Sequence, residues 1–488
     1  MNFATALDEA SKVTRTENGA LAYNTTDDAL LDLYSTIGAL RSTDDARIKR
    51  LFDCAYKADP LFATKIVFYG RDIRGGLGER KTFRTLLKHM ADNHPSAIRP
   101  NMHLVPEYGR WDDMYSFIGT PLEDDMWRLM NEQLEKDCFA LADGKNVSLL
   151  AKWVKTPDAS SKETRRLGIL TAKKLGYTVY HFKRIIRALR RRINVTESLM
   201  SAKKWDEIKY DEVPSRASTL YRNAFLKHDG DRYREFVNKA VNGEAKINSA
   251  TLYPYDIIQR YTSYGWGLRV KPLDYTLEAQ WEQLPDYVEK GSNAIVIADT
   301  SGSMHGRPIN SAIGLAIYFA ERNTGAYHNL WMSFSRTSTI HKLKGDTLQQ
   351  KINSIDFSDW ENDTNIEAAF DGILDIAVKN NVPADEMPKA LVIISDMEFN
   401  QCSNGFMYDS MAKKFAGHGY ELPNVVFWNV DSRKDTYHVR SGQKGVQLVS
   451  GSSTSAFKNL MDCVGMTPVE AMAKTINCDR YLPITIEE

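Results

Sequence analysis

The sequence predicts a multidomain protein whose halves differ in fold class, an all-α N-terminal half and an α/β C-terminal half. Apolar residues recur at helical spacing from about residue 29 to residue 250, and strand-like segments are nearly absent there. From residue 292, short β-branched runs alternate with helical stretches, which indicates a doubly wound sheet with helices on both faces. A chain of 488 residues is long enough for two or three such domains.

In the N-terminal half, short polar breaks separate successive helical segments. Leu30, Leu33 and Ile37 share one helix face, and the same spacing recurs after the next polar break. This arrangement is typical of stacked helix pairs such as HEAT-like repeats, although the sequence shows no strict repeat period. We expect residues 1–290 to form this all-helical domain.

The C-terminal half divides into six predicted strands and five predicted helices. We expect strands at residues 293–298, 330–334, 339–343, 390–395, 424–430 and 445–449. We expect helices at residues 308–322, 347–355, 365–379, 408–418 and 455–461. Because strands and helices alternate, the sheet is expected to be parallel. Residues 291–466 would form this domain, and residues 467–488 a C-terminal helix or tail that packs back on the helical domain.

The composition is that of an ordinary soluble globular chain and excludes few functional classes. Hydrophobic residues make up 43% and charged residues 26%, and 63 acidic residues balance 63 basic ones, so overall charge indicates no partner. No apolar run reaches the length of a membrane span, and the acidic N-terminus does not resemble a signal peptide. Five widely spaced cysteines without a Cys-x-x-Cys pair favour a reducing, cytoplasmic location and no zinc site.

A strand followed by an oxygen-rich loop stands at the start of the α/β half. The apolar run 293–298 precedes Asp299, Ser301 and Ser303, which occupy alternate positions shortly before a helix that begins at Pro308. Hydroxyl and carboxylate oxygens suit a hard cation such as Mg²⁺, and the carboxyl edge of a parallel sheet is the usual ligand site of open α/β folds. A plain Ser/Gly turn between strand and helix is the alternative.

The segment Asp299-Thr-Ser-Gly-Ser303 resembles the metal-ion-dependent adhesion site (MIDAS) of von Willebrand factor A domains, whose pattern is Asp-x-Ser-x-Ser. Thr364, in a loop before a helix, and Asp396, at the end of an apolar strand, fill the family's two later positions. The resemblance implies that Ser301, Ser303 and Thr364 bind Mg²⁺ or another divalent cation through their hydroxyls. Asp299 and Asp396 would hold it partly through waters, and an acidic group from a protein partner would fill the open position.

We assign no catalytic residue and expect no enzyme. His305 and His341 are the nearby histidines, but neither lies in a Gly-x-Ser-x-Gly or His-Glu-x-x-His context. A protein-bound Mg²⁺ could assist hydrolysis, but the sequence supplies no base to pair with it.

Two loops of the helical half carry arginines beside glycines or beside a tryptophan. Residues 70–82 superficially suggest a nucleotide-binding P-loop, but an arginine stands where that motif requires its last glycine. The arginines of this loop, Arg71, Arg74 and Arg80, either contact RNA phosphates or lie solvated on a turn between helices. In the second loop, residues 106–113, we favour a packing role for the Arg–Trp pair over stacking on a base.

A strongly basic stretch spans residues 162–192. It holds eleven Lys and Arg residues against one acid, Glu163, inside a chain whose total charge is balanced. On a helix, one apolar stripe would anchor the last part of this stretch while the basic side chains face outward. Phosphate contacts supply most sequence-independent affinity for nucleic acids, so we predict RNA contact, with a solvated face or an acidic protein partner as alternatives. The candidate RNA-binding residues here are Lys173, Lys174, Lys183, Arg184, Arg187, Arg190 and Arg191.

The combination of a helical half with a von Willebrand A-like domain resembles the TROVE architecture of the 60-kDa Ro ribonucleoprotein family. Several segments resemble more closely its uncharacterised sister family, domain of unknown function family 2828. These segments are Arg71–Arg80, Pro106–Asp112, Ala151–Trp153, Lys227–Asp229 and Ser395–Phe399. The resemblance implies a ring of helical repeats, closed by the A domain, that binds misfolded small RNAs and structured Y-type RNAs.

We therefore expect a non-enzymatic protein of Ro/TROVE type that binds small structured or misfolded non-coding RNA and carries Mg²⁺ in its von Willebrand A domain. One alternative is a protein-interaction module that grips an acidic residue of a partner through Mg²⁺. Another is a structural component of a larger assembly, such as a viral one. We expect a cytoplasmic monomer without membrane association.

Overall fold

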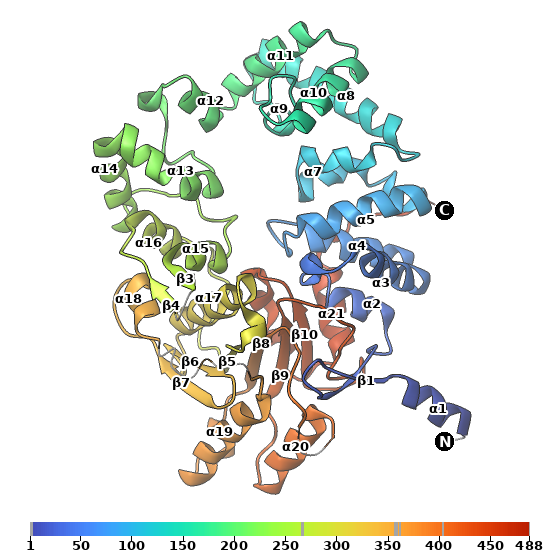
Figure 1. The fold of residues 1–488 in the computed structure, drawn as a ribbon, viewed down its shortest axis with the longest axis vertical. Helices are drawn as coiled ribbons and strands as arrows, with labels where there is room; N and C mark the ends of the chain where they lie inside the picture. The colour runs from blue at the N-terminus through green and yellow to red at the C-terminus, as the bar shows by residue number, and fades with distance from the viewer. Residues whose placement is uncertain (1–2, 265–267, 356–359, 361–362, 403–404, 488) are drawn as a thin grey trace.

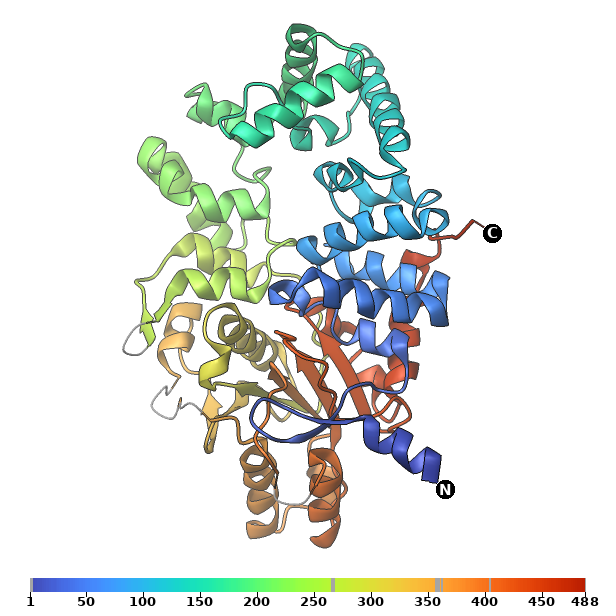
Figure 2. The ribbon, with the colours of Figure 1, turned by 45° about the vertical axis from the view of Figure 1, so that its right-hand side comes forward.

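The computed structural model of the protein describes residues 3–264, 268–355, 360, 363–402 and 405–487. Helices dominate the chain up to Glu282 and follow one another in an arc, and a six-stranded sheet with its own helices lies between the two ends of the arc (Figure 1, Figure 2). Within these residues, no helix combines the length and the apolar character that crossing a membrane requires. The predicted fold class is confirmed at the level of a helical N-terminal region followed by a mixed α/β sheet domain.

The arc is built from short helices, several of which begin at a capping side chain. Asp44 accepts a hydrogen bond from the backbone N–H of Arg47, and Asp59 accepts one from that of Phe62, just before Pro60 begins the next helix. The helices up to the sheet domain are α1 (Phe3–Ser11), α2 (Ala29–Tyr34), α3 (Asp45–Ala58), α4 (Pro60–Arg71), α5 (Arg80–Asn93), α6 (Pro95–Ile98), α7 (Val105–Tyr108), α8 (Glu123–Ala142), α9 (Leu150–Trp153), α10 (Lys162–Lys174), α11 (Val179–Arg192), α12 (Thr196–Ser201), α13 (Ser215–His228), α14 (Gly230–Val241), α15 (Pro254–Tyr261) and α16 (Tyr275–Glu282). Two small antiparallel strand pairs lie among these helices: the hairpin of β1 (Val13–Arg15) and β2 (Leu21–Tyr23) between α1 and α2, and β3 (Thr262–Tyr264) paired with β4 (Leu268–Val270) between α15 and α16.

The sheet domain contains six strands in the order β10–β9–β8–β5–β6–β7, each within one residue of its predicted position. They are β5 (Ala294–Asp299), β6 (Leu330–Phe334), β7 (Ser338–Lys342), β8 (Ala390–Ser395), β9 (Asn424–Asn429) and β10 (Val446–Ser450). Five strands are parallel, and β7 runs antiparallel to β6 at one edge. The expectation of a wholly parallel sheet is therefore wrong for β7, because residues 335–337 are too few for a crossover connection.

Helices cover both faces of this sheet. Ile393 of β8 belongs to a core with α19, α20 and α21, and the next residue, Ile394, belongs to a core with α17 and α18. The bounds of these helices are α17 (Arg307–Arg322), α18 (Leu348–Asn353), α19 (Ile366–Lys379), α20 (Met407–Gly417) and α21 (Pro468–Ile476). The helix predicted at 455–461 is instead a pair of 3₁₀ turns, Thr454–Asn459 and Met461–Cys463.

The two ends of the arc merge with opposite faces of the sheet. One hydrophobic core includes Ala20 of the β1–β2 hairpin, continues from α2 through the helices up to α11 and includes Ile393. The other core includes Ile394 and continues into α15 and α16 with Ile258 and Trp281. A separate cluster of buried residues lies around α13 and α14. The sheet domain therefore fixes the first and last parts of the arc relative to each other.

The glycine-rich loop between α4 and α5 ties the start of the arc to its end. Glu79 is buried there and accepts hydrogen bonds from Arg41, which follows α2, and from Arg307 at the start of α17. The hydroxyl of Tyr253, just before α15, donates to the carbonyl of Leu77 at 3.1 Å. These contacts support the interpretation of this loop as a connection between packed helices.

The C-terminal segment packs against the first helices of the arc. Helix α21 lies beside β10, α2 and α4. Arg480 then forms an ion pair with Asp72, and Asn101 exchanges hydrogen bonds with the backbone of Thr485. This segment therefore fastens the sheet domain to the beginning of the helical region.

Candidate metal and nucleic-acid sites

The loop after β5 contains the first part of the predicted metal site. Asp299 is fully buried at the end of β5, where it accepts hydrogen bonds from the backbone N–H of Ser301 at 2.9 Å and from the hydroxyl of Ser395 at 2.5 Å. The hydroxyl oxygens of Ser301 and Ser303 lie 3.1 Å apart. Burial, followed by the charge of nearby Asp396, raises the pKa of Asp299 to about 7. The end of β5 thus collects oxygen atoms around a carboxylate whose charge is costly to bury.

Asp396 and Thr364 approach this loop from neighbouring elements. Asp396 is buried and follows the end of β8, the strand that pairs with β5. Thr364 is buried in the loop before α19, and its carbonyl accepts a hydrogen bond from the backbone N–H of Asn400 at 3.0 Å. The five predicted metal ligands therefore lie at the carboxyl edge of the sheet, around the ends of β5 and β8.

An arginine from the loop after β9 pairs with one of these carboxylates. The Nη2 of Arg433 forms an ion pair with Asp396, and its Nη1 lies 3.4 Å from the Oε2 of Glu17. Its Nε lies 3.9 Å from the Oδ2 of Asp431. The guanidinium of Arg433 thus supplies a positive charge beside the buried carboxylate of Asp396.

The tip of the β1–β2 hairpin, residues 17–19, covers this edge of the sheet. The side-chain amide of Asn18 donates to the hydroxyl of Thr364 at 3.3 Å and to the carbonyl of Glu398 at 2.6 Å. The buried carboxylate of Glu398 accepts a hydrogen bond from the backbone N–H of Glu17 at 2.6 Å. Burial also raises the pKa of Glu398. These three hydrogen bonds hold the hairpin tip against the candidate metal site.

The donor set fits a hard divalent cation. It offers two carboxylates and three hydroxyls, the oxygen ligands that Mg²⁺ prefers. A cation here would offset both the burial of Asp299 and the repulsion between Asp299 and Asp396. Because Arg433 balances Asp396 in this structure, a cation and the guanidinium would compete for that carboxylate.

The sequence did not predict the residues that surround the predicted metal ligands. Glu398 lies inside the segment 395–399, which carries a family resemblance, but nothing in that segment indicates that its carboxylate holds the N-terminal hairpin. Asn18 is in an expected turn, and Arg433 is one basic residue among many. A sequence signal for these contacts would have to join positions such as Asn18 and Glu398, which are 380 residues apart.

His438 is a buried histidine close to the same edge. Its Nε2 lies 2.9 Å from the carbonyl oxygen of Met397, and its ring packs against Phe399. Its Nδ1 has no hydrogen-bond partner in the part of the chain that the structure describes. Burial lowers the pKa of His438 to about 4. The folded protein therefore keeps this imidazole neutral at pH values where the unfolded chain already carries its proton.

We predict that His438 makes the protein less stable as the pH falls from about 6.5 towards 4. The unfolded state binds the extra proton in this window, so the free energy of unfolding should drop by up to about 3 kcal/mol. In H438F, which keeps ring packing but cannot titrate, this part of the drop should vanish, although loss of the hydrogen bond to Met397 should cost about 1 kcal/mol at pH 8. Urea unfolding at pH 8, 6 and 4.5 measures both effects. A constant difference between the two proteins at all three pH values would contradict the prediction.

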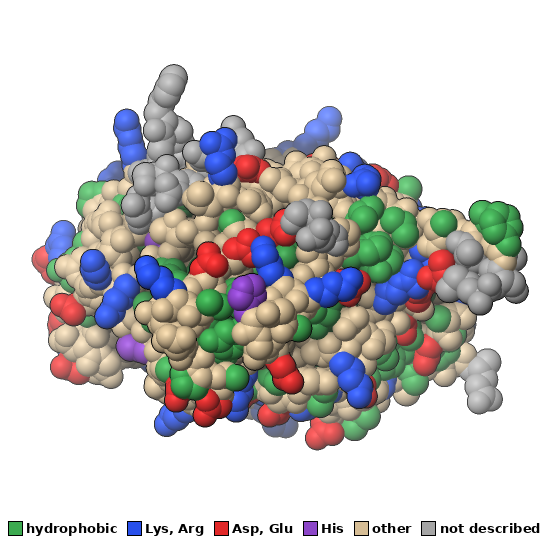
Figure 3. Space-filling view, turned by 90° about the horizontal axis from the view of Figure 1, so that it is seen from below, with side chains coloured by type: hydrophobic (Ala, Val, Ile, Leu, Met, Phe, Trp, Pro, Cys, Tyr) green, Lys and Arg blue, Asp and Glu red, His purple; other side chains and the backbone are tan. Residues whose placement is uncertain are grey.

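The basic stretch forms α10 and α11, and α11 lines a concavity of about 1040 Å³ together with the ends of α9 and α12. The basic side chains that line it are Lys152, Lys183, Arg187, Arg190, Arg191 and Lys204. The acidic ones are Asp158, Glu197 and Glu207. By contrast, Lys and Arg side chains are interspersed with Asp and Glu over the end of the molecule formed by the sheet domain (Figure 3). The lining of the concavity thus holds twice as many basic as acidic side chains, whereas this end of the molecule carries both kinds.

The candidate residues within the concavity differ in their freedom to bind a ligand. Arg190 is partly buried and donates hydrogen bonds to the carbonyls of Ala151 and Val154 at 2.8 Å and 3.3 Å, so it caps the end of α9. Arg187 and Arg191 are exposed on α11. Arg187 and Arg191 are therefore better placed than Arg190 to contact a bound anion.

Three other candidates of the basic stretch lie outside the concavity. Lys174 forms an ion pair with Glu123 at 3.1 Å. Arg184 is exposed and lies over the ring of Tyr180, with 5.7 Å from its guanidinium carbon to the ring centre. Lys173 is exposed on α10. These side chains extend the basic surface along the outside of the two helices.

The three arginines of the glycine-rich loop do not line the concavity. Arg71 is only 2% exposed and forms an ion pair with the fully buried Asp113 at 2.9 Å. The expectation that Arg71 contacts RNA is therefore wrong, because its guanidinium is part of the protein interior. Arg74 is exposed and donates to the carbonyl of Glu107 at 3.2 Å, and Arg80 is exposed at the start of α5.

The Arg–Trp loop has the packing role predicted for it. Arg110 pairs with Asp112, and its guanidinium lies 4.0 Å from the ring centre of Trp153 at the end of α9. Trp111 of the same loop is buried in the core of the helical region. This loop therefore connects α7 to α9, whose last residue, Trp153, lines the basic concavity.

Comparison with known proteins finds matches to two family models, both without an assigned function. Residues 16–126 and 160–293 match the family described as "Domain of unknown function (DUF2828)", as the sequence motifs indicated, and residues 293–480 match "Domain of unknown function (DUF7788)". An uncharacterized protein of Acanthamoeba polyphaga mimivirus is 27% identical over 502 residues, which cover 94% of this chain and 86% of that protein. Among solved structures, the Deinococcus radiodurans RO (RSR) protein is similar with a TM-score of 0.41 and 14% identity, over 88% of this chain and 93% of the other.

Proposed function

The chain belongs to the DUF2828 family, a domain of unknown function, and we propose that it is a non-enzymatic RNA-binding protein of Ro/TROVE type. In this proposal, small structured or misfolded non-coding RNA binds the basic concavity beside α11. The HEAT-like helical arc and the sheet domain form the ring that carries the concavity, and the sheet domain holds Mg²⁺ or another divalent cation. The observation that carries the proposal is the concavity itself, where six Lys and Arg face three acids in a chain of zero net charge.

The layout of the cations suits a polyanion better than a single carboxylate. Lys183, Arg187 and Arg191 follow one another at intervals of four residues on α11, so they form a row with about 6 Å between successive positions along the axis. Phosphates that run along such a row can be contacted together, and each contact releases counterions from the nucleic acid. Trp153, whose ring packs against the guanidinium of Arg110 on one face, also lines the concavity, and unpaired bases stack on rings of this kind.

A binding titration of a labelled RNA hairpin tests the proposal. Fluorescence anisotropy should detect binding at 50 mM KCl, and the affinity should fall on the order of 10² to 10³-fold at 200 mM, as expected for about four to six phosphate contacts. A double-stranded DNA of the same length serves as the comparison, and structured RNA should bind at least as tightly. No binding at 50 mM KCl, or an affinity that does not change with salt, would overturn the proposal.

In this proposal the protein catalyses no reaction and is located in the cytoplasm. The hydroxyls of Ser301 and Ser303 contact each other beside Asp299, an arrangement that suits cation binding rather than activation of a nucleophile. All five cysteines are free, as is usual in a reducing compartment. A purified chain that sediments as a monomer would agree with the expected oligomeric state.

A second candidate function is favoured by the covered edge of the sheet. There the domain would bind a protein partner through Mg²⁺, with an acidic side chain of the partner as one ligand. The residues that would hold the ion are Asp299, Ser301, Ser303, Thr364 and Asp396. A partner would have to displace the hairpin tip, and Arg433 would have to release Asp396. Glu17 lies 3.4 Å from Arg433, so its carboxylate is a candidate for the position that the partner's acid would take.

Addition of Mg²⁺ is expected to stabilise the protein if this site binds the ion. At 100 times the dissociation constant, the free energy of unfolding should rise by about 2.7 kcal/mol. Thermal unfolding in EDTA and in millimolar MgCl₂ measures the shift, which should be lost in D299N. D431N is the matched control, because Asp431 lies 3.9 Å from Arg433 but is not a predicted ligand. Equal shifts in D299N and in the wild-type protein would contradict Mg²⁺ binding at this site.

A further inference from the structure

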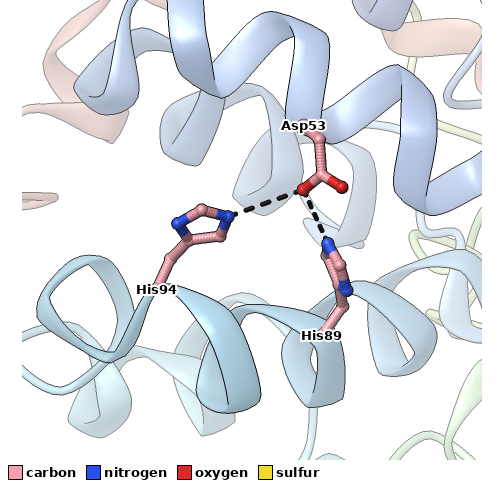
Figure 4. A group of neighbouring side chains, drawn as sticks. All are labelled: Asp53, His89 and His94. Carbon is pink, nitrogen blue, oxygen red and sulfur yellow. Dashed lines mark hydrogen bonds and ion pairs between the residues drawn. The ribbon is translucent and has the colours of Figure 1, made fainter.

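Two histidines and one aspartate meet on the side of the helical region near its beginning. Asp53 comes from α3, His89 from α5, and His94 stands at the corner where α5 ends and α6 begins. Both imidazole rings point towards the same carboxylate (Figure 4). The Oδ1 of Asp53 lies 2.6 Å from the Nε2 of His89 and 3.5 Å from the Nε2 of His94, and one nitrogen or oxygen of each residue lies within 4.8 Å of the others. Among the described residues, this is the one group of at least three His, Cys, Asp or Glu with that spacing.

We propose that Asp53, His89 and His94 form a binding site for a divalent transition-metal ion, with Zn²⁺ as the ion to test. Two imidazoles and one carboxylate are a ligand set that Zn²⁺ uses in proteins, with a water or another ligand in the fourth position. At Zn–N and Zn–O distances near 2.0–2.2 Å, ligand atoms of a tetrahedral site lie about 3.4 Å apart. The distances from the Oδ1 of Asp53 to the two Nε2 atoms, 2.6 Å and 3.5 Å, lie on either side of this value. An ion therefore needs only small movements of the rings to enter.

The surroundings hold the imidazoles in place. The side-chain amide of Asn93 lies 3.1 Å from the Nδ1 of His89, the nitrogen opposite the one that faces Asp53. In a metal complex through Nε2 this Nδ1 would carry its proton, so the amide of Asn93 would turn its oxygen to accept it and would give up its present hydrogen bond to the backbone carbonyl of His89 at 2.9 Å. The ring of Tyr56 packs on His94 with 4.1 Å between ring centres. The contact of Asn93 with His89 and the packing of Tyr56 on His94 together limit the rotation of both imidazoles.

The cluster is also open enough for an ion to reach it. The side chains of His89, His94 and Asp53 are 12%, 26% and 38% exposed, so one side of the group faces solvent. A hydrogen bond between Asp53 and His89 alone would explain one contact, but it does not explain why His94 turns towards the same oxygen. A shared ion between the three ligand atoms accounts for both orientations and would join α3 to the corner between α5 and α6.

No sequence pattern marks this group. The ligands come from three positions on two helices and a corner. Four residues separate His89 from His94, a spacing that zinc fingers use for their two histidines, but the Cys-x-x-Cys pair of those motifs is absent from the sequence. The expectation of no zinc site was based on the cysteines alone, and the proposed site uses none of them. It is also separate from the oxygen-rich site in the sheet domain, whose ligands suit Mg²⁺ instead.

Metal titration of the full-length protein tests the proposal. The chain should carry the C54S change, because Cys54 is exposed beside Asp53 and could bind Zn²⁺ on its own. Competition with a chromophoric chelator should show one tightly bound Zn²⁺ per chain, and Co²⁺ should give the intense visible bands of a tetrahedral complex. H89A and H94A should each weaken binding about 100-fold or more, and N93A about 10-fold.

H103A is the matched control, because His103 is exposed on the 3₁₀ turn Met102–Leu104 and is not part of the cluster. It should bind Zn²⁺ like the parent, and D299N should do so too, which separates this site from the one in the sheet domain. Circular dichroism shows whether H89A and H94A are folded, and the conservative variants H89Q and H94Q replace them if they are not. The absence of tight Zn²⁺ binding in the parent, or equal binding in the parent and the histidine variants, would overturn the proposal.

Discussion

Reversing three charges in the basic concavity is expected to reduce RNA affinity on the order of 100-fold or more. The variant K183E/R187E/R191E replaces the row of cations on α11 by carboxylates, and each lost phosphate contact also removes its share of counterion release. The salt dependence should become shallower by about one contact for each residue changed. Anisotropy titrations of the same RNA hairpin at several KCl concentrations measure both quantities.

The control for this experiment changes the net charge by the same amount at another place. Lys342, Lys379 and Lys413 are exposed on the sheet domain, and K342E/K379E/K413E should bind RNA within a few-fold of the wild-type protein. Arg190 is left unchanged, because it caps α9 and its loss would perturb the fold. If both triple variants lose affinity equally, long-range charge rather than the concavity governs binding, and the proposed site is wrong.

Replacing Asp113 with alanine is expected to destabilise the protein by about 3 to 5 kcal/mol. Asp113 is fully buried and accepts hydrogen bonds from the side chains of Arg71 and Arg84 and from the backbone N–H of Arg110. Its loss would leave the guanidinium of Arg71, only 2% exposed, without its carboxylate in the interior. The midpoint of urea unfolding should therefore move to a much lower concentration.

Asp125 offers the matched control for this prediction. It forms ion pairs with Arg128 and Arg99, whose side chains are 69% and 50% exposed, and such surface pairs contribute at most about 1 kcal/mol each. D125A should therefore unfold close to the wild-type midpoint. If D113A did so as well, the buried pair would not hold α4 to the loop before α8, as its position indicates.

The strands of the sheet domain were predictable because the information that defines them is local. In β8, six consecutive buried residues reach from Ala390 to Ser395, and such an apolar run bounded by polar residues has few other structures open to it. The two aspartates of the predicted metal site were predictable for the same reason, because Asp299 and Asp396 stand where two adjacent parallel strands end. The antiparallel β7 was placed at the right residues but in the wrong direction, because direction depends on the connection rather than on the strand.

The features that were not predictable depend on contacts between distant residues. The β1–β2 hairpin has strands of only three residues, too short for a clear alternation, and its tip is fixed by Glu398 near the other end of the chain. Arg71 has the surroundings of an exposed turn in sequence, yet Asp113, 42 residues later, holds it in the core. Local spacing reports which face of an element is buried, and it carries no information about which distant side chain completes an ion pair or a metal site.

Ultraviolet cross-linking of a bound RNA hairpin, followed by peptide mass spectrometry, shows whether RNA binds in the concavity beside α11. If RNA binds there, cross-linked peptides come from residues 152–207, which include Trp153 and the row on α11, and excess unlabelled RNA removes the cross-links. Cross-links confined to the sheet domain, or the same pattern from K183E/R187E/R191E as from the wild-type protein, would contradict it.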